Sequence, residues 1–464
     1  MLKLSDFRNK KVLIMGLGLH GGGVGAAAFF AKRGSRVMVT DLKTKKELAP
    51  SIVALRRFRN ITYHLGGHLA RDFRTVDYII KNPGVPEDSQ FLKIAKGARV
   101  PVLSDVEIFF RVCLAPIIGI TGTKGKSTTA TLLYRILKQD PRKIRVRDPR
   151  RFRVWIAGNI RKSVLDILPR IRKGDLIVLE LSSFQLDSLK QSRMSPRIAV
   201  ITNIFPDHLN RYPSFRAYVA SKANLFRYQR KSDYLFVNAR DALLERIAKH
   251  APGRVIRFNP PAIFRRFSRA WPAGIPHYHI PNIAAAIAVA RRLGVGERMI
   301  RSVLRRFRGL PGRMEHIRTV RGVTFINDTT ATNPEAAAQA VREAKRMIGK
   351  HRLHVIAGGY DKRLPVDKFI QALMPAATSV IFLPGNATEK MKSQILNPKS
   401  QRNLKSQIPK IFDAKTMAEA VKIAFRNTKH GDVVLLSPGA ASFGLFKHEF
   451  DRGGKFVRAV RQLG

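Results

Sequence analysis

A glycine-rich, lysine-containing turn between residues 117 and 129 carries the clearest chemistry in this sequence. It reads IIGITGTKGKSTT, with an apolar run before the turn and hydroxyl side chains after it. A turn between a buried strand and a helix N-terminus points backbone N–H groups and the positive end of the helix dipole at one anion. Lys126 can neutralise the outer phosphates of a nucleotide, and Ser127 or Thr128 can offer a hydroxyl to Mg²⁺. Ile120 stands where the usual pattern has its first glycine, so an ordinary strand–helix turn is the alternative interpretation.

A carboxylate and an imidazole follow two further apolar runs of the same region. Leu176–Leu179 and Ile198–Ile201 predict buried parallel strands, and Glu180 and His208 lie beyond their ends. Open α/β sheets bind ligands at the C-terminal ends of their strands. A single Glu or His in such a place is more often structural, but two of them in one phosphate-binding domain favour a metal site.

A second glycine-rich turn lies close to the N-terminus. Val12–Met15 predicts a strand, Gly18 and its neighbouring glycines form the turn, and an Ala-rich helix leads to a second strand that ends at Asp41. This is the pattern of a Rossmann-type βαβ unit. Taken alone it predicts NAD, with Asp41 on a ribose hydroxyl, although any diphosphate that carries a ribose suits the same turn. Asn82 ends a later strand and either approaches the ligand or simply shapes its own turn.

The order of these elements predicts an α/β protein of three domains. Residues 1–112 form a Rossmann-like domain, residues 113–309 a central sheet of the phosphate-loop type, and residues 310–464 a second Rossmann-like domain. In the last segment, apolar strands again end in small-residue or polar turns such as NDTTATNPEA and SPGAASF. The polar, basic stretch 387–410 predicts a surface helix and loop without chemistry.

Composition places the chain among large soluble proteins of a reducing compartment. It has 464 residues, 45% of them hydrophobic, and one cysteine, Cys113, which rules out an internal disulfide. The first apolar stretch runs directly into glycines, which favours a buried strand over a signal peptide. No apolar run is long enough to span a bilayer, so we expect a cytoplasmic protein without membrane insertion.

The charge of the chain is unusual. Eighty-six Lys and Arg residues stand against 32 Asp and Glu residues, which gives a formal charge of +54 and an isoelectric point near 11.4. Such an excess raises nucleic acid as a partner, and a nucleic-acid-associated ATPase is one alternative. The basic clusters are dispersed and follow no recognisable binding motif. We therefore expect no specific nucleic-acid partner.

Nine sequence blocks, taken in order, resemble the Mur ligase family over essentially the whole chain. The blocks are TGTKGKST, AGNI, LELSSFQL, the T-N-x-x-x-D-H-L-x-R-Y run at 202–212, SKANLF, LPGRME, NDTTATNPEA, AGGYDK and LLSPGAASF. LELSSFQL and SPGAASF favour the branch of the family that adds D-glutamate. One alternative is a Mur ligase of different amino-acid specificity. Another, based on the N-terminal glycine turn only, is an NAD-dependent dehydrogenase, which leaves two-thirds of the chain unexplained.

The resemblance implies an ATP-dependent amide ligase of peptidoglycan precursor synthesis. ATP phosphorylates the alanyl carboxylate of UDP-N-acetylmuramoyl-L-alanine, the amine of D-glutamate attacks the acyl phosphate, and phosphate leaves. Two Mg²⁺ ions and cationic side chains screen the approach of one anion to another. The expected partners are these small substrates, and the expected state is a monomer.

The resemblance also implies a role for individual residues. The catalytic residues would be Lys126, Lys222 and His208. The metal ligands would be Ser127, Glu180, His208 and Lys222, the last of them carbamylated by CO₂. The ATP contacts would be Gly122, Thr123, Lys124, Gly125, Lys126, Ser127, Thr128, Asn159, Asn282, Arg313 and Asp328. The UDP-sugar contacts would be Gly18, Leu19, His20, Asp41, Asn82 and Gln185, and the D-glutamate contacts Thr332, Lys362 and Ser442.

Three positions depart from the pattern of the family. His279 replaces an asparagine on the adenine side, and Thr329-Thr330 replaces Ser-Lys, which removes one cation. The usual Lys-Asn-Phe-Glu run reads Lys-His-Glu-Phe here, with Glu449 at its third position, so the far side of the amino-acid pocket departs from the pattern. None of these departures removes an expected metal ligand, so we expect an active enzyme.

Overall fold

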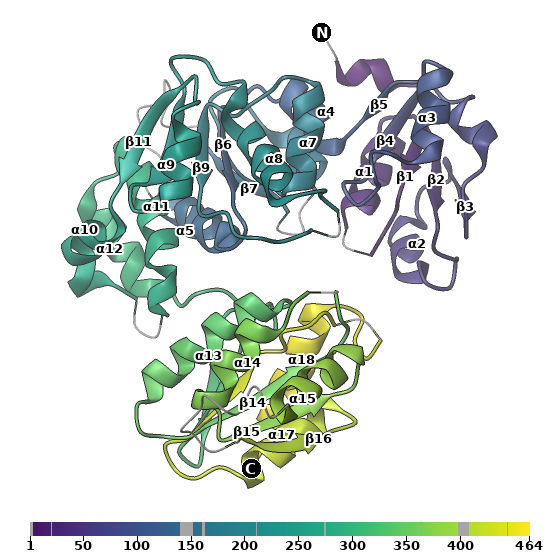
Figure 1. Cartoon of the computed structure of the whole chain (residues 1–464). Coiled ribbons are helices and arrows are strands. Elements are labelled where there is room, and N and C mark those ends of the chain that lie inside the picture. The colour runs from purple at the N-terminus through teal and green to yellow at the C-terminus, as the bar shows by residue number, and fades with distance from the viewer. Residues whose placement is uncertain are drawn as a thin grey trace. The chain divides into compact units, whose positions relative to one another are not determined.

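The computed structural model describes residues 3–19, 21–139, 152–159, 163–209, 211–272, 275–362, 364–397, 408–442 and 444–464 (Figure 1). The chain divides into two compact units. The first comprises Met1–Trp271 and Ile280–Arg305, and the second comprises Pro272–His279 and Arg306–Gly464. Helices alternate with strands of three mainly parallel sheets, which confirms the predicted α/β class.

The N-terminal sheet has five parallel strands in the order β3-β2-β1-β4-β5, the order of a Rossmann fold. Its strands are β1 (Lys11–Met15), β2 (Arg36–Asp41), β3 (Ile61–Leu65), β4 (Tyr78–Lys81) and β5 (Val102–Leu103). Its helices are η1 (Leu4–Phe7), α1 (Gly22–Ala31), α2 (Ala49–Leu55), η2 (Ala70–Phe73), α3 (Gln90–Gly97) and α4 (Asp105–Val112). Small residues let α1 pack closely on the sheet, because Gly23 lies against the backbone of the preceding turn.

The central sheet has six parallel strands in the order β11-β10-β9-β6-β8-β7. They are β6 (Ile117–Thr121), β7 (Val154–Gly158), β8 (Leu176–Glu180), β9 (Ile198–Ile201), β10 (Tyr234–Asn238) and β11 (Arg254–Phe258). The helices of this segment are α5 (Lys126–Gln139), α6 (Val164–Ile167), η4 (Leu168–Arg170), α7 (Ser183–Gln191), α8 (Phe215–Arg227), α9 (Ala242–Ala248), α10 (Pro260–Phe267), η5 (Ser268–Ala270), α11 (Ile280–Arg292) and α12 (Glu297–Arg306).

The position of β6 between β8 and β9 determines where the polar loops of this sheet meet. All three strands are buried along their whole length, as their continuous apolar sequences predict. Since the three strands are parallel, the phosphate loop, Glu180 and the segment after β9 emerge at the same edge of the sheet. This edge is the predicted ligand-binding edge of an open α/β sheet.

The C-terminal sheet has six strands in the order β12-β13-β17-β14-β15-β16, of which only the β12–β13 pair is antiparallel. They are β12 (Glu315–Val320), β13 (Val323–Asn327), β14 (Leu353–Gly358), β15 (Ser379–Leu383), β16 (Lys410–Asp413) and β17 (Val433–Leu436). The helices of this unit are η6 (His277–His279), α13 (Pro334–Ile348), α14 (Asp367–Ala376), α15 (Asn386–Leu396), α17 (Met417–Arg426) and α18 (Glu449–Arg461).

Helix α15 is the helix of the helix and loop predicted over residues 387–410, while positions 398–407 lie outside the described residues. No helix in the described part of the chain is long and apolar enough to cross a membrane.

Candidate active site

The phosphate loop after β6 requires glycine at two positions. Gly122 and Gly125 have φ angles of 153° and 82°. A Cβ atom on Gly122 would lie 1.9 Å from Thr202 Oγ1, and one on Gly125 would lie 1.9 Å from Asn282 Oδ1. Any side chain at either position would therefore displace the loop from its neighbours.

Two residues after β9 hold the phosphate loop in place. The Lys124 N–H donates to Asn203 Oδ1 at 2.9 Å, and Thr202 Oγ1 donates to the Lys124 carbonyl at 2.6 Å. The Thr123 N–H donates to the Asn203 carbonyl at 2.9 Å. Neither Thr202 nor Asn203 is among the site residues expected from the sequence, although both lie in the block after β9 that carries the resemblance.

Lys126 and Lys222 meet at one carbonyl of this loop. Lys126 Nζ donates to the carbonyls of Gly122 at 2.8 Å and Thr123 at 3.1 Å, and Lys222 Nζ donates to the same Gly122 oxygen at 3.0 Å. The Lys222 side chain, on α8, is 1% exposed. Burial, and then the charge of Lys126, lower the pKa of Lys222 well below its ordinary value.

Aromatic and acidic groups surround Lys222. Its Nζ lies 4.7 Å from the centroid of the Tyr218 ring, which faces it as a cation–π partner. The carboxylates of Asp207, Asp187 and Glu180 act on Lys222 electrostatically and partly oppose the lowering of its pKa. The buried amine is thus subject both to carboxylates, which favour its charged form, and to Lys126, which disfavours it.

Only one carboxylate oxygen of Glu180 accepts a hydrogen bond from the described residues. Its side chain is 1% exposed, and Oε1 accepts from Asn159 Nδ2 at 3.0 Å. The Asn159 N–H also donates to the Glu180 carbonyl at 3.0 Å, so the ends of β7 and β8 are joined. Glu180 Oε2 is buried and has no hydrogen-bond partner among the described residues. A buried carboxylate oxygen with nothing to bind fits a hard cation such as Mg²⁺.

His208 lies in the same region with a strained backbone. Its φ angle is 54°, which non-glycine residues seldom adopt. Its ring centroid lies 5.1 Å from that of Phe184 and 6.2 Å from that of Tyr218, the ring that faces Lys222. Within the described ranges, no group of three or more His, Cys, Asp or Glu side chains is arranged to hold a metal ion.

Hydroxyl groups lie at the start of α5, as predicted. This helix begins at Lys126, so Ser127 and Thr128 occupy its first turn, where the helix dipole favours an anion. Thr128 is buried, and Thr129 Oγ1 donates to the Asn282 carbonyl of α11 at 3.0 Å. The helix that carries Asn282 is thereby fixed against the phosphate loop.

The N-terminal glycine turn binds a carboxylate of its own chain. The N–H groups of Leu17 and Gly18 donate to Asp41 Oδ2 at 2.8 and 3.0 Å, and the Lys43 N–H donates to Asp41 Oδ1 at 2.9 Å. Asp41 therefore holds this turn in its conformation. Leu19, the next residue along the turn, is exposed. His20 lies outside the described residues.

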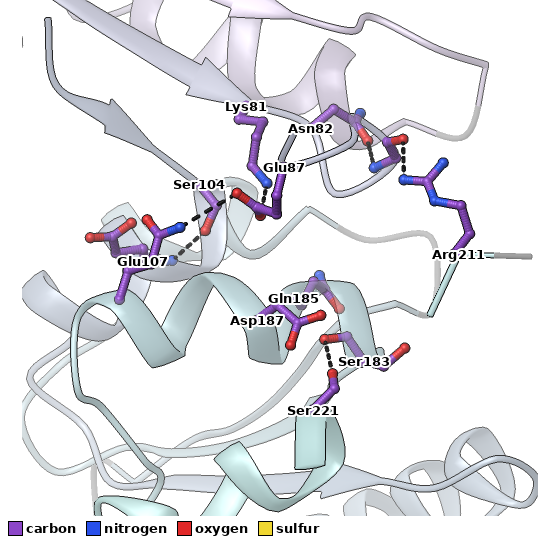
Figure 2. A network of polar contacts seen from close by, with 12 residues as sticks. Lys81, Asn82, Glu87, Ser104, Glu107, Ser183, Gln185, Asp187, Arg211 and Ser221 are labelled. Atoms are coloured by element: carbon purple, nitrogen blue, oxygen red, sulfur yellow. Dashed lines mark hydrogen bonds and ion pairs between the residues drawn. The ribbon is translucent and has the colours of Figure 1, made fainter. Parts of the chain in front are cut away.

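Asn82 and Gln185, two more predicted contacts of the UDP-sugar, also have local roles. Asn82 Nδ2 donates to the Gly16 carbonyl at 3.2 Å. Asn82, labelled in Figure 2, also accepts through Oδ1 from the Gly84 N–H at 3.1 Å. Gln185 Oε1 accepts from the Ser182 N–H at 3.0 Å and completes the capping box of α7. Both residues lie in the first unit, together with the phosphate loop.

In the second unit, Asp328 follows β13 and lies near Arg313. Asp328 Oδ1 accepts from the Met314 N–H at 3.1 Å, which fixes the loop that carries Arg313. His279 is buried, and burial followed by the charge of Arg313 lowers its pKa to about 4. His279 is thus a neutral imidazole at neutral pH.

Two of the three residues predicted to bind D-glutamate, Thr332 and Lys362, line one small pocket, and Ser442 does not line it. Lys362 Nζ donates to Thr332 Oγ1 at 3.3 Å, and both residues line the pocket. Tyr360 also lines it and forms a β-bridge with Ala441, the residue before Ser442. Ser442 is buried beside this bridge.

Arg452 on α18 connects the loops of this unit, and the sequence analysis did not identify it. It is fully buried, and its guanidinium donates to Thr329 Oγ1 at 3.2 Å, to the Thr329 carbonyl at 2.9 Å and to the Ala440 carbonyl at 3.1 Å. Burial lowers its pKa to about 10. Arg452 thus joins the loop after β13 to the loop after β17.

Comparisons with known proteins agree with this arrangement of elements. Residues 10–104 match the Mur ligase MurD-like N-terminal domain, residues 120–262 the Mur ligase middle domain, and residues 312–439 the Mur ligase glutamate ligase domain. Among solved structures, UDP-N-acetylmuramate-alanine ligase MurC from Thermotoga maritima has a TM-score of 0.60 at 18% identity, covering 97% of this chain and 99% of its own. A MurF ligase from Thermotoga maritima in complex with ADP has a TM-score of 0.57 at 16% identity, covering 100% of both chains.

Curated relatives match over their full length. The chain is 38% identical to UDP-N-acetylmuramoylalanine--D-glutamate ligase of Roseiflexus sp. (strain RS-1), covering 98% of this chain and 99% of the relative. It is 34% identical to the ligase of the same name from Borreliella burgdorferi (strain ATCC 35210), covering 99% of this chain and 100% of the relative. The expected resemblance is therefore confirmed, and the chain belongs to the Mur ligase family.

Proposed function

We propose that this chain is an ATP-dependent ligase that joins D-glutamate to UDP-N-acetylmuramoyl-L-alanine in peptidoglycan precursor synthesis. The observation that carries the proposal is the phosphate loop whose Gly122 carbonyl holds Lys126 and Lys222, on the sheet edge that also carries Glu180. The full-length relatives named UDP-N-acetylmuramoylalanine--D-glutamate ligase support the choice of substrates.

In this proposal the chain's own groups place a nucleotide phosphate against the alanyl carboxylate. The N–H groups of residues 122–128 and the start of α5 hold the phosphates, and Lys126 moves from the loop carbonyls to the outer phosphate oxygens. Asn159 borders the phosphates, and Asn282 serves the adenine or ribose side of ATP. In the second unit, Arg313 and Asp328 serve the phosphate and ribose sides of ATP.

The metal ligands in this proposal are Glu180 through Oε2, His208, Ser127 and a carbamylated Lys222. The pair of Mg²⁺ ions they would hold neutralises charge on the phosphates and the carboxylate. The buried, unbonded oxygen of Glu180 supports this assignment. A carbamate on Lys222 would supply oxygen donors in a region where the described residues offer no three-residue cluster of ordinary ligands.

We assign the UDP-sugar and D-glutamate to two different sets of residues. Gly18, Leu19, His20, Asp41, Asn82 and Gln185 would serve the UDP-sugar. Because both oxygens of Asp41 already accept N–H groups, we propose that it acts chiefly by shaping the turn. Thr332, Lys362 and Ser442 would bind D-glutamate, with Lys362 paired to a carboxylate. Domain boundaries near residues 112 and 309, a monomeric state and a cytoplasmic location remain predictions of the same proposal.

The test is phosphate release from ATP with UDP-N-acetylmuramoyl-L-alanine and a panel of amino acids. We expect release only with both the acceptor and D-glutamate. Lys362→Ala should raise KM for D-glutamate by about tenfold or more, the cost of one lost charge-assisted bond. KM for the acceptor should not change. Better turnover with L-lysine, meso-diaminopimelate or L-alanine would refute the assigned specificity.

A further inference from the structure

A cavity of about 540 Å³ lies in the first unit, outside the sites proposed for ATP and the acceptor. Residues from the end of β4, from α3, β5 and α4 of the N-terminal segment line one side, and Ser188 and Gln191 of α7 line the other. A cavity of this size is typical of small-molecule sites. None of the residues assigned to the proposed reaction lines it.

The charged groups deep in this cavity are already neutralised. The Lys81 side chain is 5% exposed and forms an ion pair with Glu87, which also accepts from Gln191 Nε2 at 3.4 Å. The Glu107 side chain is buried and is paired with Arg111 at 2.5 Å. Figure 2 shows Lys81, Glu87 and Glu107 gathered above α7. The interior therefore needs no counter-ion from a ligand.

One buried hydroxyl in the cavity has no partner. Ser188 is 4% exposed and lines the cavity, and its Oγ makes no hydrogen bond to any described residue. Leaving a buried hydroxyl unbonded is energetically unfavourable. The Oγ atom is closed to solvent in this conformation, so it pairs with a molecule in the cavity only once the Ser188 side chain rotates.

The exposed charged residues that line the cavity are Lys93, Lys96 and Glu87, the last of them paired with Lys81, and part of the wall is apolar. Lys93 and Lys96 lie three residues apart on α3, so they share one face of the helix. Both are exposed, and no ion pair with either is present in the described part of the chain. Leu92, Val100 and Leu103 supply apolar surface between the mouth and the interior.

We propose that this cavity is a second ligand site, which binds a small organic anion with a short apolar body. The carboxylate or phosphate monoester of such a molecule lies between Lys93 and Lys96. Its body packs on Leu92, Val100 and Leu103, and a polar atom of the ligand pairs with Ser188. Because both halves of the first unit line the cavity, the ligand joins the N-terminal segment to α7.

The binding experiment uses the full chain and four probes, measured by calorimetry at physiological salt. Octanoate and hexyl phosphate carry the proposed chemistry and distinguish a carboxylate from a phosphate source. Octylamine has the same kind of body with the opposite charge, and sulfate is an anion without a body. We expect saturable binding of octanoate or hexyl phosphate only. Equal binding of octylamine or sulfate would overturn the proposal.

Matched variants separate this site from the general positive charge of the protein. Lys93→Gln with Lys96→Gln should weaken the anion about five- to tenfold, the sum of two exposed ionic contacts. Lys173→Gln with Lys231→Gln removes the same charge from exposed positions that do not line the cavity, and should leave binding unchanged. Equal losses in the two double variants would refute a specific site.

A third variant tests the interior. Ser188→Ala removes a hydroxyl that has no partner in the described structure, so it should fold with unchanged or higher stability. It should still weaken the anion about threefold, as the loss of one modest hydrogen bond predicts. Unchanged affinity in this variant would contradict the proposed pose. Competition between octanoate and UDP-N-acetylmuramoyl-L-alanine would instead place the anion in the acceptor site and refute a second site.

Discussion

The side-chain nitrogens of Lys126 and Lys222 both donate to the carbonyl oxygen of Gly122, at 2.8 and 3.0 Å. Two ammonium groups on one oxygen repel each other, and the buried one gains least from water. The consequence is a lowered pKa at Lys222, with burial as the larger cause and Lys126 as the second. The arrangement therefore favours a neutral amine at Lys222 and a mobile cation at Lys126.

Lys126→Ala should abolish turnover and leave binding of the UDP-sugar intact. The variant removes a cation that faces developing phosphate charge, which typically costs about 10²–10³ in rate. Phosphate release measures the first effect, and calorimetry with the acceptor measures the second. Lys138→Ala, at the exposed C-terminal end of the same helix, is the control and should retain activity. Near-normal turnover of Lys126→Ala would refute the assignment of the loop.

Glu180→Gln should separate the metal response from folding. The substitution keeps an oxygen for Asn159 and removes a buried charge with an unbonded oxygen, so the ligand-free protein should melt at the same or a higher temperature. The rise in Tm that Mg²⁺ and ATP give the unsubstituted protein should largely disappear.

The control for this experiment is Asp175→Asn. Asp175 is a buried carboxylate that accepts from the Arg153 N–H, the Trp155 ring nitrogen and the Arg172 N–H, at 2.7 to 3.0 Å. Asp175→Asn should lower Tm, while the rise in Tm that Mg²⁺ and ATP give should remain. A full metal response in Glu180→Gln would show that Glu180 is not a ligand.

Much of this site follows from the sequence, because the edge of a parallel sheet is predictable. Glu180 and the phosphate loop come together since their strands are neighbours, and apolar runs followed by polar residues reveal strand ends. The partners of Asp41 and Gln185 were not predictable. Asp41 binds the turn 23 and 24 residues before it, and Gln185 caps its own helix. A polar side chain that hydrogen-bonds to the protein's own backbone has the same sequence signature as one that binds a ligand.

The tertiary hydrogen bonds of the loops were also beyond sequence reasoning. Asn203 reaches a backbone N–H 79 residues away, and Arg452 reaches Thr329 across 123 residues. Only the strand order, with β9 beside β6 and β13 beside β17, brings such positions together. Hydrophobic periodicity indicates that strands exist but does not fix their order.

Stability should fall between pH 6.5 and pH 4 because of His279. Its pKa is about 6.5 in the unfolded chain and about 4 in the folded protein, where burial and Arg313 disfavour the charged form. Below pH 6.5 the unfolded state binds the proton more readily, so the stabilisation is present above that pH and is lost as the pH falls. The loss approaches about 3 kcal/mol near pH 4.

His279→Asn, which restores the residue usual in the family, isolates this contribution. Urea denaturation at pH 7 and pH 4.5 should show a smaller difference in the variant. His354 is buried with its pKa lowered in the same direction, so a residual slope is expected. An identical pH dependence in both proteins would contradict the assigned pKa of His279.

The positive charge should give nucleic-acid binding that depends on salt and not on sequence. Dispersed Lys and Arg side chains release counter-ions from phosphates, so affinity should fall by orders of magnitude between about 50 and 200 mM salt. Fluorescence anisotropy with two unrelated DNA duplexes measures both properties. Nanomolar binding to only one of them at physiological salt would revive a specific nucleic-acid function.

Lys222→Ala tests the role that departs most from ordinary lysine chemistry. A neutral amine adds CO₂ to form a carbamate, whose oxygens suit Mg²⁺, and the buried setting of Lys222 favours that neutral amine. Without it, turnover should fall by at least about 10², and added formate or acetate should restore part of it by supplying carboxylate oxygens to the vacated space. Lys222→Arg should not be rescued, because its guanidinium fills that space and keeps a positive charge.

The alternative is that Lys222 is unmodified and only donates a hydrogen bond to the Gly122 carbonyl. In that case both variants would lose activity alike and neither would respond to formate. An unmodified side chain in active, CO₂-equilibrated protein, measured by ¹³C NMR after labelling with ¹³CO₂, would rule out the carbamate directly.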